Sequence, residues 1–295
     1  MATVSDTVLG SGPRTPQLRR RHRRDRTMTL LLTALMIGIG GLLAWILAYV
    51  AVQGLQALDW GFLTDTPPGN PSDTGGGFYN GIIGSLIIVG IATLLAVPLG
   101  IGGAVYLNQY ATGRMAGVLR LVTDVMLGIP TIVTGAFIYA LWVVEFGFSG
   151  YAGAFALGLV MVPLIVRATE EMLRLVPRDI REASLALGAT KSRTIVSVLL
   201  PTAGAGIITG VMLAVARAMG ETAPLLLTTL GNDLFVETNP GERMSTLSLQ
   251  IFGSATGGFP AAQARAWAGA LTLIVIVLLL TIIARLIARK SAVGR

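Results

Sequence analysis

Six long runs of mainly apolar residues constrain the fold of this chain more than any other feature. Each run is close to the length, about 20 residues, that a helix needs to cross the hydrocarbon of a membrane. Only 13% of the 295 residues are charged, against about 25% in an ordinary soluble domain, which argues against a soluble enzyme and against a disordered chain. The sequence therefore predicts an all-α, polytopic membrane protein with six transmembrane helices. They run approximately over Met28–Val52, Gly81–Leu107, Gly117–Leu141, Tyr151–Val166 (continuing toward Leu175), Gly204–Leu230 and Trp267–Ala284.

The basic residues predict the orientation of these helices. All but three of the 22 Lys and Arg residues fall in the two tails and in the second and fourth connections. Because cytoplasmic segments are enriched in Lys and Arg, we expect both termini in the cytoplasm, which requires an even number of spans. The expected layout is a basic cytoplasmic tail over 1–27, a six-helix domain over 28–288, exterior loops at about 53–80 and 231–266, a cytoplasmic connection at about 167–201, and a cytoplasmic tail over 289–295.

Composition narrows the chemistry that this chain can perform. It contains no Cys, and its single His, His22, lies in an Arg-rich run, so disulfides, thiolate nucleophiles and Cys-ligated metals are excluded. We expect no metal and no cofactor. The net charge of +7 is interpreted as a topology anchor at the lipid surface, not as a nucleic-acid site. Neither exterior loop has the size of a globular domain, so a module that captures substrate would be another polypeptide.

The connection over 176–188 has the signals of a short amphipathic helix. Pro177 suits the first helical position, Asp179 and Glu182 lie near the positive end of the helix dipole, and Gly188 can close the helix with a left-handed cap. A helix here would place four residues on one modest apolar face: Ile180, Ala183, Ser184 and Leu187. On this pattern alone, the helix could dock a cytoplasmic partner or lie on the lipid surface.

Two charged residues fall inside the fifth apolar run. Arg217 lies near its middle, where a charge costs at least about 2.5–3.5 kcal/mol, so it should face a cavity or a partner. Glu221 follows four residues later and can pair with it. A continuous helix would place both on one stripe with Gly206, Gly210, Ala214, Pro224 and Thr228. The pair could simply fix helix packing, or the Arg217 guanidinium could bind an anion near the membrane midplane.

A motif in the fourth connection resembles the EAA loop of permeases in ATP-binding-cassette (ABC) importers. It consists of Glu182-Ala183-Ser184, Gly188 and Val198-Leu199-Leu200-Pro201, with Ser184 in place of the family's second Ala. The resemblance implies a coupling helix in a groove of an ATPase subunit, with Glu182, Ala183, Ser184 and Gly188 as coupling positions. The nearest approach to a phosphate-binding loop in this chain, Gly188–Ser192, lacks two of the required glycines. ATP would therefore be bound by partner subunits.

A second set of motifs is similar to the permease subunits of bacterial phosphate importers. The motifs are Pro98–Ile101, Gly128–Gly135, Arg167–Glu171, Leu200–Gly210 and Ala216–Leu226, and the similarity covers about Phe62 to Arg285. One departure is Gln109, where an acidic residue is expected in many relatives. The resemblance implies the architecture of a type I importer permease in the bacterial cytoplasmic (inner) membrane, with inorganic phosphate as the substrate. It further implies a homologous companion permease, two ATP-binding subunits and an extracytoplasmic phosphate-binding protein.

The candidate substrate-pathway residues are Arg217, Glu221, Thr222 and Arg167. Arg167 could instead be an anchor at the membrane surface paired with Glu170 or Glu171, and Asp124 is expected to pair with Arg120. Pro130 and Pro163 are expected to kink their helices. The residues alone leave open a permease for sulfate, molybdate or phosphonate, a channel or secondary transporter without ATP coupling, and a membrane scaffold or sensor subunit.

Overall fold

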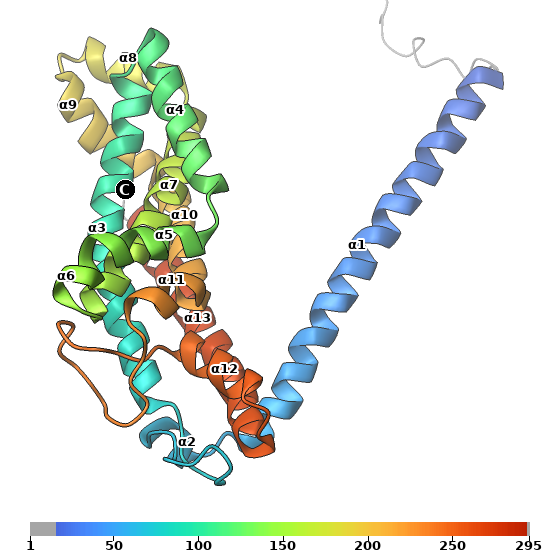
Figure 1. Cartoon of the computed structure of the whole chain (residues 1–295). Helices are drawn as coiled ribbons and strands as arrows, with labels where there is room; N and C mark the ends of the chain where they lie inside the picture. Colours follow the sequence, from blue (N-terminus) through green and yellow to red (C-terminus); the bar gives the residue numbers. More distant parts are fainter. Residues whose placement is uncertain (1–15, 294–295) are drawn as a thin grey trace, which may run out of the picture. The chain divides into compact units, whose positions relative to one another are not determined.

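A computed structural model describes residues 16–293 of the chain, and the side chains of residues 24–286 (Figure 1). Most of the basic tail predicted over residues 1–27, and the side chains of the C-terminal tail over 289–295, lie outside this described part. The first helix, α1 (Pro16–Ala57), contains an apolar segment from Arg24 to Ala57 that is long enough to cross a membrane. Residues up to Val52 form one unit and residues from Gln53 onward form another.

The second unit is a bundle of long apolar helices. In the described part of the chain, five helices, α1 included, are long and apolar enough to span a membrane. A bent pair of shorter helices brings the number of candidate spans to six if it counts as one span. In the bundle these are α3 (Tyr79–Gln109), α7 (Gly150–Leu175), a continuous stretch from Lys191 to Gly220, and α13 (Pro260–Val293). The stretch from Lys191 joins α9 (Lys191–Thr194), the π-helical turn η2 (Ile195–Leu199) and α10 (Leu200–Gly220). The prediction of an all-α polytopic fold is confirmed.

The third predicted span, Gly117–Leu141, is not a single helix. It is divided between α4 (Gly113–Gly128) and a second segment that runs to Phe146, and the two meet at an angle of 98°. Pro130 lacks the N–H that a continuing helix needs and disfavours helical geometry at Ile129, and both residues have extended ψ angles near 130°. The expected kink at Pro130 is therefore a break. The second segment consists of α5 (Thr131–Ile138), the π-helical turn η1 (Tyr139–Val143) and α6 (Val144–Phe146).

The fifth predicted span and the second exterior loop also differ from expectation. The fifth span ends at Gly220, and a separate short helix, α11 (Ala223–Thr228), follows it. The loop predicted over 231–266 contains α12 (Leu247–Thr256), whose residues Leu247, Ser248 and Gln250 are buried. Helix α12, with 10 residues, is too short to cross a membrane, and burial in the bundle stabilises it instead.

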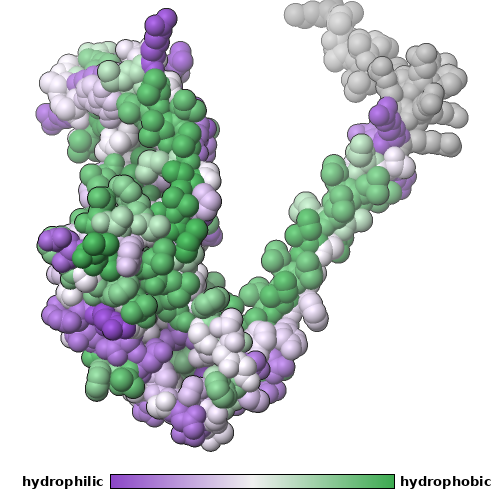
Figure 2. Space-filling view, viewed as in Figure 1, coloured by the Kyte–Doolittle hydropathy of each residue, from purple (hydrophilic) through white to green (hydrophobic). Residues whose placement is uncertain are grey.

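The bundle has two distinct ends (Figure 1). Helices α8 (Arg178–Ala186) and α9 lie at one end, which we call the α8 end, whereas α2 (Trp60–Thr64) and α12 lie toward the other, the α2 end. Hydrophilic residues gather at both ends of the bundle, and a broad hydrophobic surface lies between them (Figure 2). This distribution matches an apolar belt in lipid between two polar regions.

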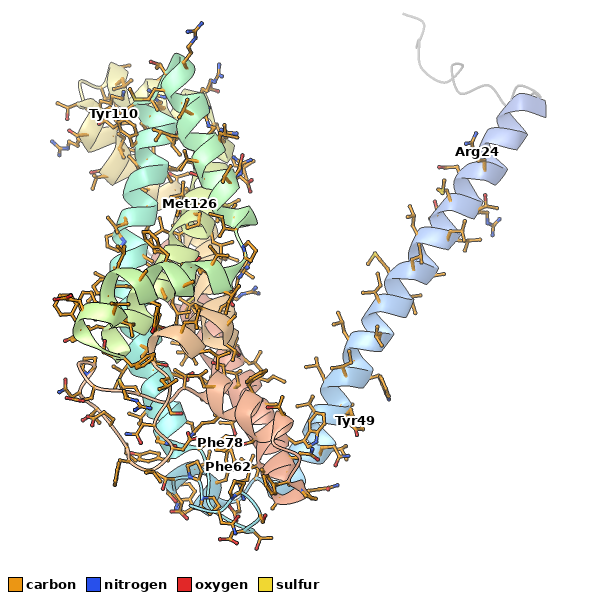
Figure 3. All side chains as sticks on the ribbon, viewed as in Figure 1. Arg24, Tyr49, Phe62, Phe78, Tyr110 and Met126 are labelled. Atoms are coloured by element: carbon orange, nitrogen blue, oxygen red, sulfur yellow. The ribbon has the colours of Figure 1, made fainter. Side chains whose placement is uncertain are left out.

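The core lies between α3, α7 and α10. Helix α3 packs along α7, and small side chains such as Ala92, Ala96 and Ala154 are completely buried there beside Leu157 and Met161. Small residues let the helix backbones approach closely, which replaces the hydrophobic driving force that is missing in lipid. At the α2 end, Phe62 of α2 packs against Phe78 with the ring centroids 5.3 Å apart (Figure 3).

Candidate functional site

Two helix breaks, about 90 residues apart in the sequence, lie next to each other in the bundle. The first break is at Ile129–Pro130 and exposes the start of α5. The second follows Gly220, where Glu221 takes an extended conformation with ψ 129°. The Thr131 hydroxyl donates a hydrogen bond to Glu221 Oε2 across 3.1 Å, which joins the two breaks directly. The two motifs that resembled phosphate permeases, around Pro130 and around Glu221, therefore form one site.

Arg217 and Glu221 form the predicted ion pair. Arg217 Nε lies 3.2 Å from Glu221 Oε1, and the Arg217 side chain is 49% exposed whereas that of Glu221 is 15% exposed. The predicted stripe holds only as far as Arg217, which occupies the last turn of α10, because the helix ends before Glu221. The free carbonyls at this helix end carry negative partial charge and stabilise the Arg217 cation.

Glu221 is held from a second side by α12, the helix that the sequence did not predict. Ser248 of α12 donates its hydroxyl to the backbone oxygen of Glu221 across 2.9 Å. Helices α5, α10 and α12 thus all fix this one residue. Thr222, another predicted pathway residue, is the residue before α11 and accepts a backbone hydrogen bond from Leu226.

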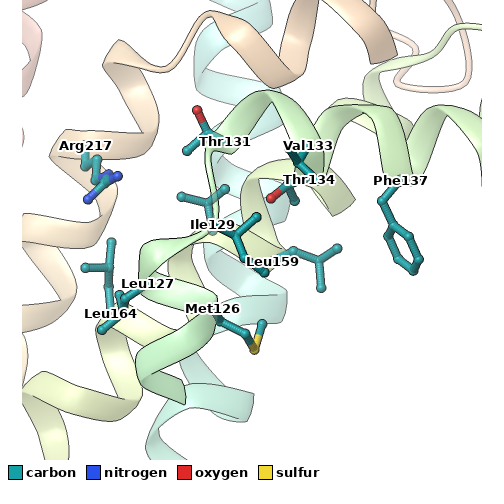
Figure 4. A pocket seen from close by; sticks show the side chains of 11 residues that line it. Met126, Leu127, Ile129, Thr131, Val133, Thr134, Phe137, Leu159, Leu164 and Arg217 are labelled. Atoms are coloured by element: carbon teal, nitrogen blue, oxygen red, sulfur yellow. The ribbon is translucent and has the colours of Figure 1, made fainter. Parts of the chain in front are cut away.

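A cavity of about 260 Å³ lies beside Arg217 (Figure 4). Its polar lining residues are Arg217, Thr131 and Thr134, and the others are apolar. This volume is far larger than one water molecule needs. Arg217 uses only its Nε in a described contact, so its Nη groups can donate to a bound group. The guanidinium and two hydroxyls are donors suited to an oxyanion.

The packing of α5 on α11 is unusually close. A Cβ atom on Gly135 would lie 2.6 Å from the Cα atom of Pro224. Only glycine fits at this position. Thr131 lies four residues before Gly135 and Glu221 lies three residues before Pro224, so this contact also fixes Thr131 relative to Glu221. Neither the close contact nor the role of Thr131 was predicted. The available signal was the motif Gly128–Gly135, whose one proline and two glycines mark a special backbone path.

Arg167 belongs to a different cluster, centred on Glu170. Glu170 is 1% exposed and accepts hydrogen bonds from Arg120 Nε at 2.8 Å and from Arg174 Nη2 at 2.6 Å. Arg167 lies 3.6–3.9 Å from Asp124, Glu170 and Glu171. It is not among the residues that line the cavity of Arg217.

The pairing predicted between Arg120 and Asp124 is wrong. Arg120 pairs with Glu170, which lies 50 residues away in the sequence, and so joins α4 to α7. The local signals of this cluster were the spacing of Arg167 to Glu170 and Glu171, which we predicted, and the spacing of four residues between Glu170 and Arg174, which we did not.

The short amphipathic helix is present as α8 and has no buried residue. Gly188 has φ +83°, the left-handed cap expected there. Glu182 and Ala183 are exposed, and Leu187 is 88% exposed. Ser184 differs from these, because its hydroxyl lies 3.0 Å from the hydroxyl of Thr194 in α9. An exposed helix that is tied at both ends to long apolar helices can receive a partner and pass on its movement.

The fold and these two features define a class: a multi-pass membrane subunit with a half-exposed charged site beside a cavity and an exposed short helix at one end of the bundle. The chain belongs to the family of binding-protein-dependent transport system inner membrane components, whose model matches residues 96–293. Among the described residues, no group of three or more His, Asp or Glu side chains is arranged to hold a metal ion.

Named relatives and a solved structure agree with this membership. The chain is 39% identical over 290 residues to the phosphate transport system permease protein PstA of Yersinia pestis, covering 97% of each chain. It is 41% identical over 275 residues to PstA 1 of Mycobacterium tuberculosis (strain CDC 1551 / Oshkosh), covering 92% of this chain and 90% of the relative. A crystal structure of a bacterial alginate ABC transporter, with a periplasmic protein that holds an alginate pentasaccharide, contains a chain with a TM-score of 0.65 and 14% identity, covering 93% of this chain and 98% of that one. The fold is therefore that of a type I ABC importer permease.

Proposed function

We propose that this chain is the permease subunit of an ATP-driven importer of inorganic phosphate, and that it forms half of the pathway. The observation that carries the proposal is the site where Arg217, Thr131 and Thr134 line one cavity, built from the motifs shared with phosphate permeases. The partners are a homologous permease, two ATP-binding subunits and an extracytoplasmic phosphate-binding protein. The complex would lie in the bacterial cytoplasmic (inner) membrane with both termini of this chain inside. ATP would be bound by the partner subunits, and this chain would bind no cofactor.

In this proposal, Arg217 is the anion contact and Glu221 regulates it. Without phosphate, Glu221 neutralises Arg217 across the 3.2 Å contact and lowers the cost of a charge inside the membrane. When phosphate arrives, the free Nη groups can donate two parallel hydrogen bonds to its oxygens. The nearby carboxylate repels the anion and keeps it from binding too tightly to leave. We assign no direct contact to Thr222, and Arg167 would hold the α8 end of α7 through its carboxylate partners.

Helix α8 would couple this site to ATP hydrolysis. Glu182 and Ala183 are exposed and would contact the ATPase, and Gly188 would end the helix so that it fits a groove. Ser184 would join α8 to α9, because its hydroxyl faces Thr194. Helix α8 does not line the cavity. Alternating access therefore requires that a movement of α8 be transmitted through the bundle to the helices around the cavity.

The substrate site is tested by phosphate uptake at micromolar phosphate in cells that lack this subunit. We expect Arg217→Gln to abolish uptake and Arg217→Lys, which keeps the charge but loses the planar fork, to lower it. Arg114→Gln is the matched control, because Arg114 is exposed at the start of α4. Each complex is checked for assembly by copurified ATPase. Uptake that survives Arg217→Gln would return Arg217 to a packing role. A wild-type subunit that restores the uptake of sulfate or molybdate but not of phosphate would identify another oxyanion as the substrate.

The docking of α8 can be tested by single-site crosslinking, because the chain has no native cysteine. A photoreactive maleimide on Ala183→Cys or Leu187→Cys should crosslink this chain to the ATPase subunit. The same probe on Ser72→Cys, which is exposed at the α2 end, should not. Crosslinking from Ser72→Cys alone would place the ATPase at the opposite end and contradict the proposal.

A further inference from the structure

The side chain of Lys191 joins helix α9 to the end of α3, beside the packing of Ile195 and Leu199 with Ile101 and Val105 of α3. Its Nζ donates a hydrogen bond to the backbone oxygen of Gln109 across 2.5 Å. The same Nζ lies 4.1 Å from the centroid of the Tyr110 ring, and this ring stacks on that of Tyr106 with an angle of 12° between the planes. Figure 3 labels Tyr110 at the α8 end of the bundle.

Three features of the position suit a cation: a free carbonyl oxygen, the negative end of a helix dipole and an aromatic ring. Gln109 is the last residue of α3, so its oxygen has no partner within the helix and carries part of the negative end of the helix dipole. The face of a tyrosine ring attracts an ammonium group. The departure from the family at Gln109 leaves this contact intact, because Lys191 binds the backbone and not the side chain.

On its other side, α9 is fastened to α8. Thr194 is 2% exposed, and its hydroxyl lies 3.0 Å from that of Ser184. The connection between the helices folds back on α8, because the N–H groups of Leu187, Gly188 and Ala189 donate to carbonyl oxygens of that helix. We call residues 178–194 the α8–α9 hairpin. Its two helices are joined at the side chains and along the connection, so they are expected to move together.

Helix α3 is well placed to receive this movement. It is 31 residues long and runs the length of the bundle from the α8 end toward the α2 end (Figure 1). It packs along α7 and also contacts α10 and α12, the helices that carry Arg217 and Ser248. A displacement of the hairpin can therefore reach the helices of Arg217 and Ser248, which both contact Glu221, through one continuous helix.

We propose that Lys191 is a positioning residue that anchors the α8–α9 hairpin to α3, so that movement imposed on α8 drives the permease. The anchor transmits force and does not touch the substrate or the ATPase. This inference rests on the proposed docking of α8. Without the anchor, the hairpin follows the ATPase while α3 stays in place, and ATP is hydrolysed without transport.

The test uses the complete importer in proteoliposomes, with the binding protein present, and measures both phosphate uptake and ATP hydrolysis. We expect Lys191→Met to retain phosphate-stimulated hydrolysis and to lower the phosphate transported per ATP about fivefold, the factor that corresponds to roughly 1 kcal/mol. Lys191→Arg keeps a cation over the ring and should restore most of the ratio. The matched control is Arg193→Met, which removes the other cation of α9 and should leave the ratio unchanged.

Two variants of Tyr110 test the same anchor without changing the charge of the hairpin. Tyr110→Leu should lower the ratio, whereas Tyr110→Phe, which keeps the ring face, should not. This pair also decides the question if Lys191→Met fails to assemble. The anchor is overturned if Lys191→Met matches Arg193→Met, if it loses hydrolysis and uptake in proportion, or if Tyr110→Leu matches Tyr110→Phe. A wild-type complex that binds no ATPase or takes up no phosphate would instead refute the proposed function.

Discussion

Neutralising Glu170 should destabilise the bundle, because this buried carboxylate joins α4 to α7. Removing one partner of a buried ion pair costs about 3–5 kcal/mol, whereas an exposed pair contributes up to about 1 kcal/mol. Glu170 is 2% exposed at its side chain, but Arg120 and Arg174 are 34% and 49% exposed. Glutamine keeps an acceptor oxygen for one of them. We therefore expect Glu170→Gln to cost about 2 kcal/mol, which lies between the two limits.

This cost is large enough to measure as a fall in apparent melting temperature. About 2 kcal/mol corresponds to a fall of roughly 4–8 °C in the melting temperature for a chain of this order of size. The melting temperature is measured by size-exclusion chromatography of the detergent-solubilised complex after heating. Glu171→Gln is the matched control: Glu171 is the next residue, but its side chain is 58% exposed, so its loss should shift the midpoint by less than about 2 °C. Equal shifts for the two variants would refute the reasoning that burial makes Glu170 the joint.

Two further predictions concern the site between the helix breaks. Gly135→Ala should lower both stability and phosphate uptake, because its new Cβ would lie 2.6 Å from the Cα atom of Pro224. Gly128→Ala is the control and should change neither the melting temperature nor uptake, since no atom outside its own helix lies within 4 Å of a Cβ there. Equal effects of the two variants would exclude the close contact as the cause. Thr131→Val removes the donor to Glu221 and should raise the phosphate concentration for half-maximal uptake about tenfold, equivalent to about 1.4 kcal/mol. Thr131→Ser should behave as the wild type, and a normal concentration dependence for Thr131→Val would show that this hydroxyl does not act at the site.

The features that the sequence could determine are local ones. Long apolar runs identify helices in a membrane whatever their neighbours are. The Arg217–Glu221 pair follows from a spacing of four residues, and its contact survives although the helix ends between the two residues. The helix α8 follows from a proline before it and a glycine after it. Each of these features depends on residues close together in the sequence, so local backbone geometry and hydropathy are enough to predict it.

The remaining features depend on where whole helices lie, and only the tertiary structure decides that. Hydropathy is the same for one straight span and for two segments at 98°, so it could not distinguish the break at Pro130 from a kink. Arg120 has Asp124 one turn away and still pairs with Glu170 on α7, because the packing of α4 on α7 buries that carboxylate beside it. The contact of Thr131 with Glu221 spans 90 residues, and that of Lys191 with α3 spans 82. The sequence determined the apolar spans, the charged pair and the short amphipathic helix α8. The meeting of two broken helices beside a cavity is a property of the folded bundle, because contacts between distant residues exist only once the helices are packed.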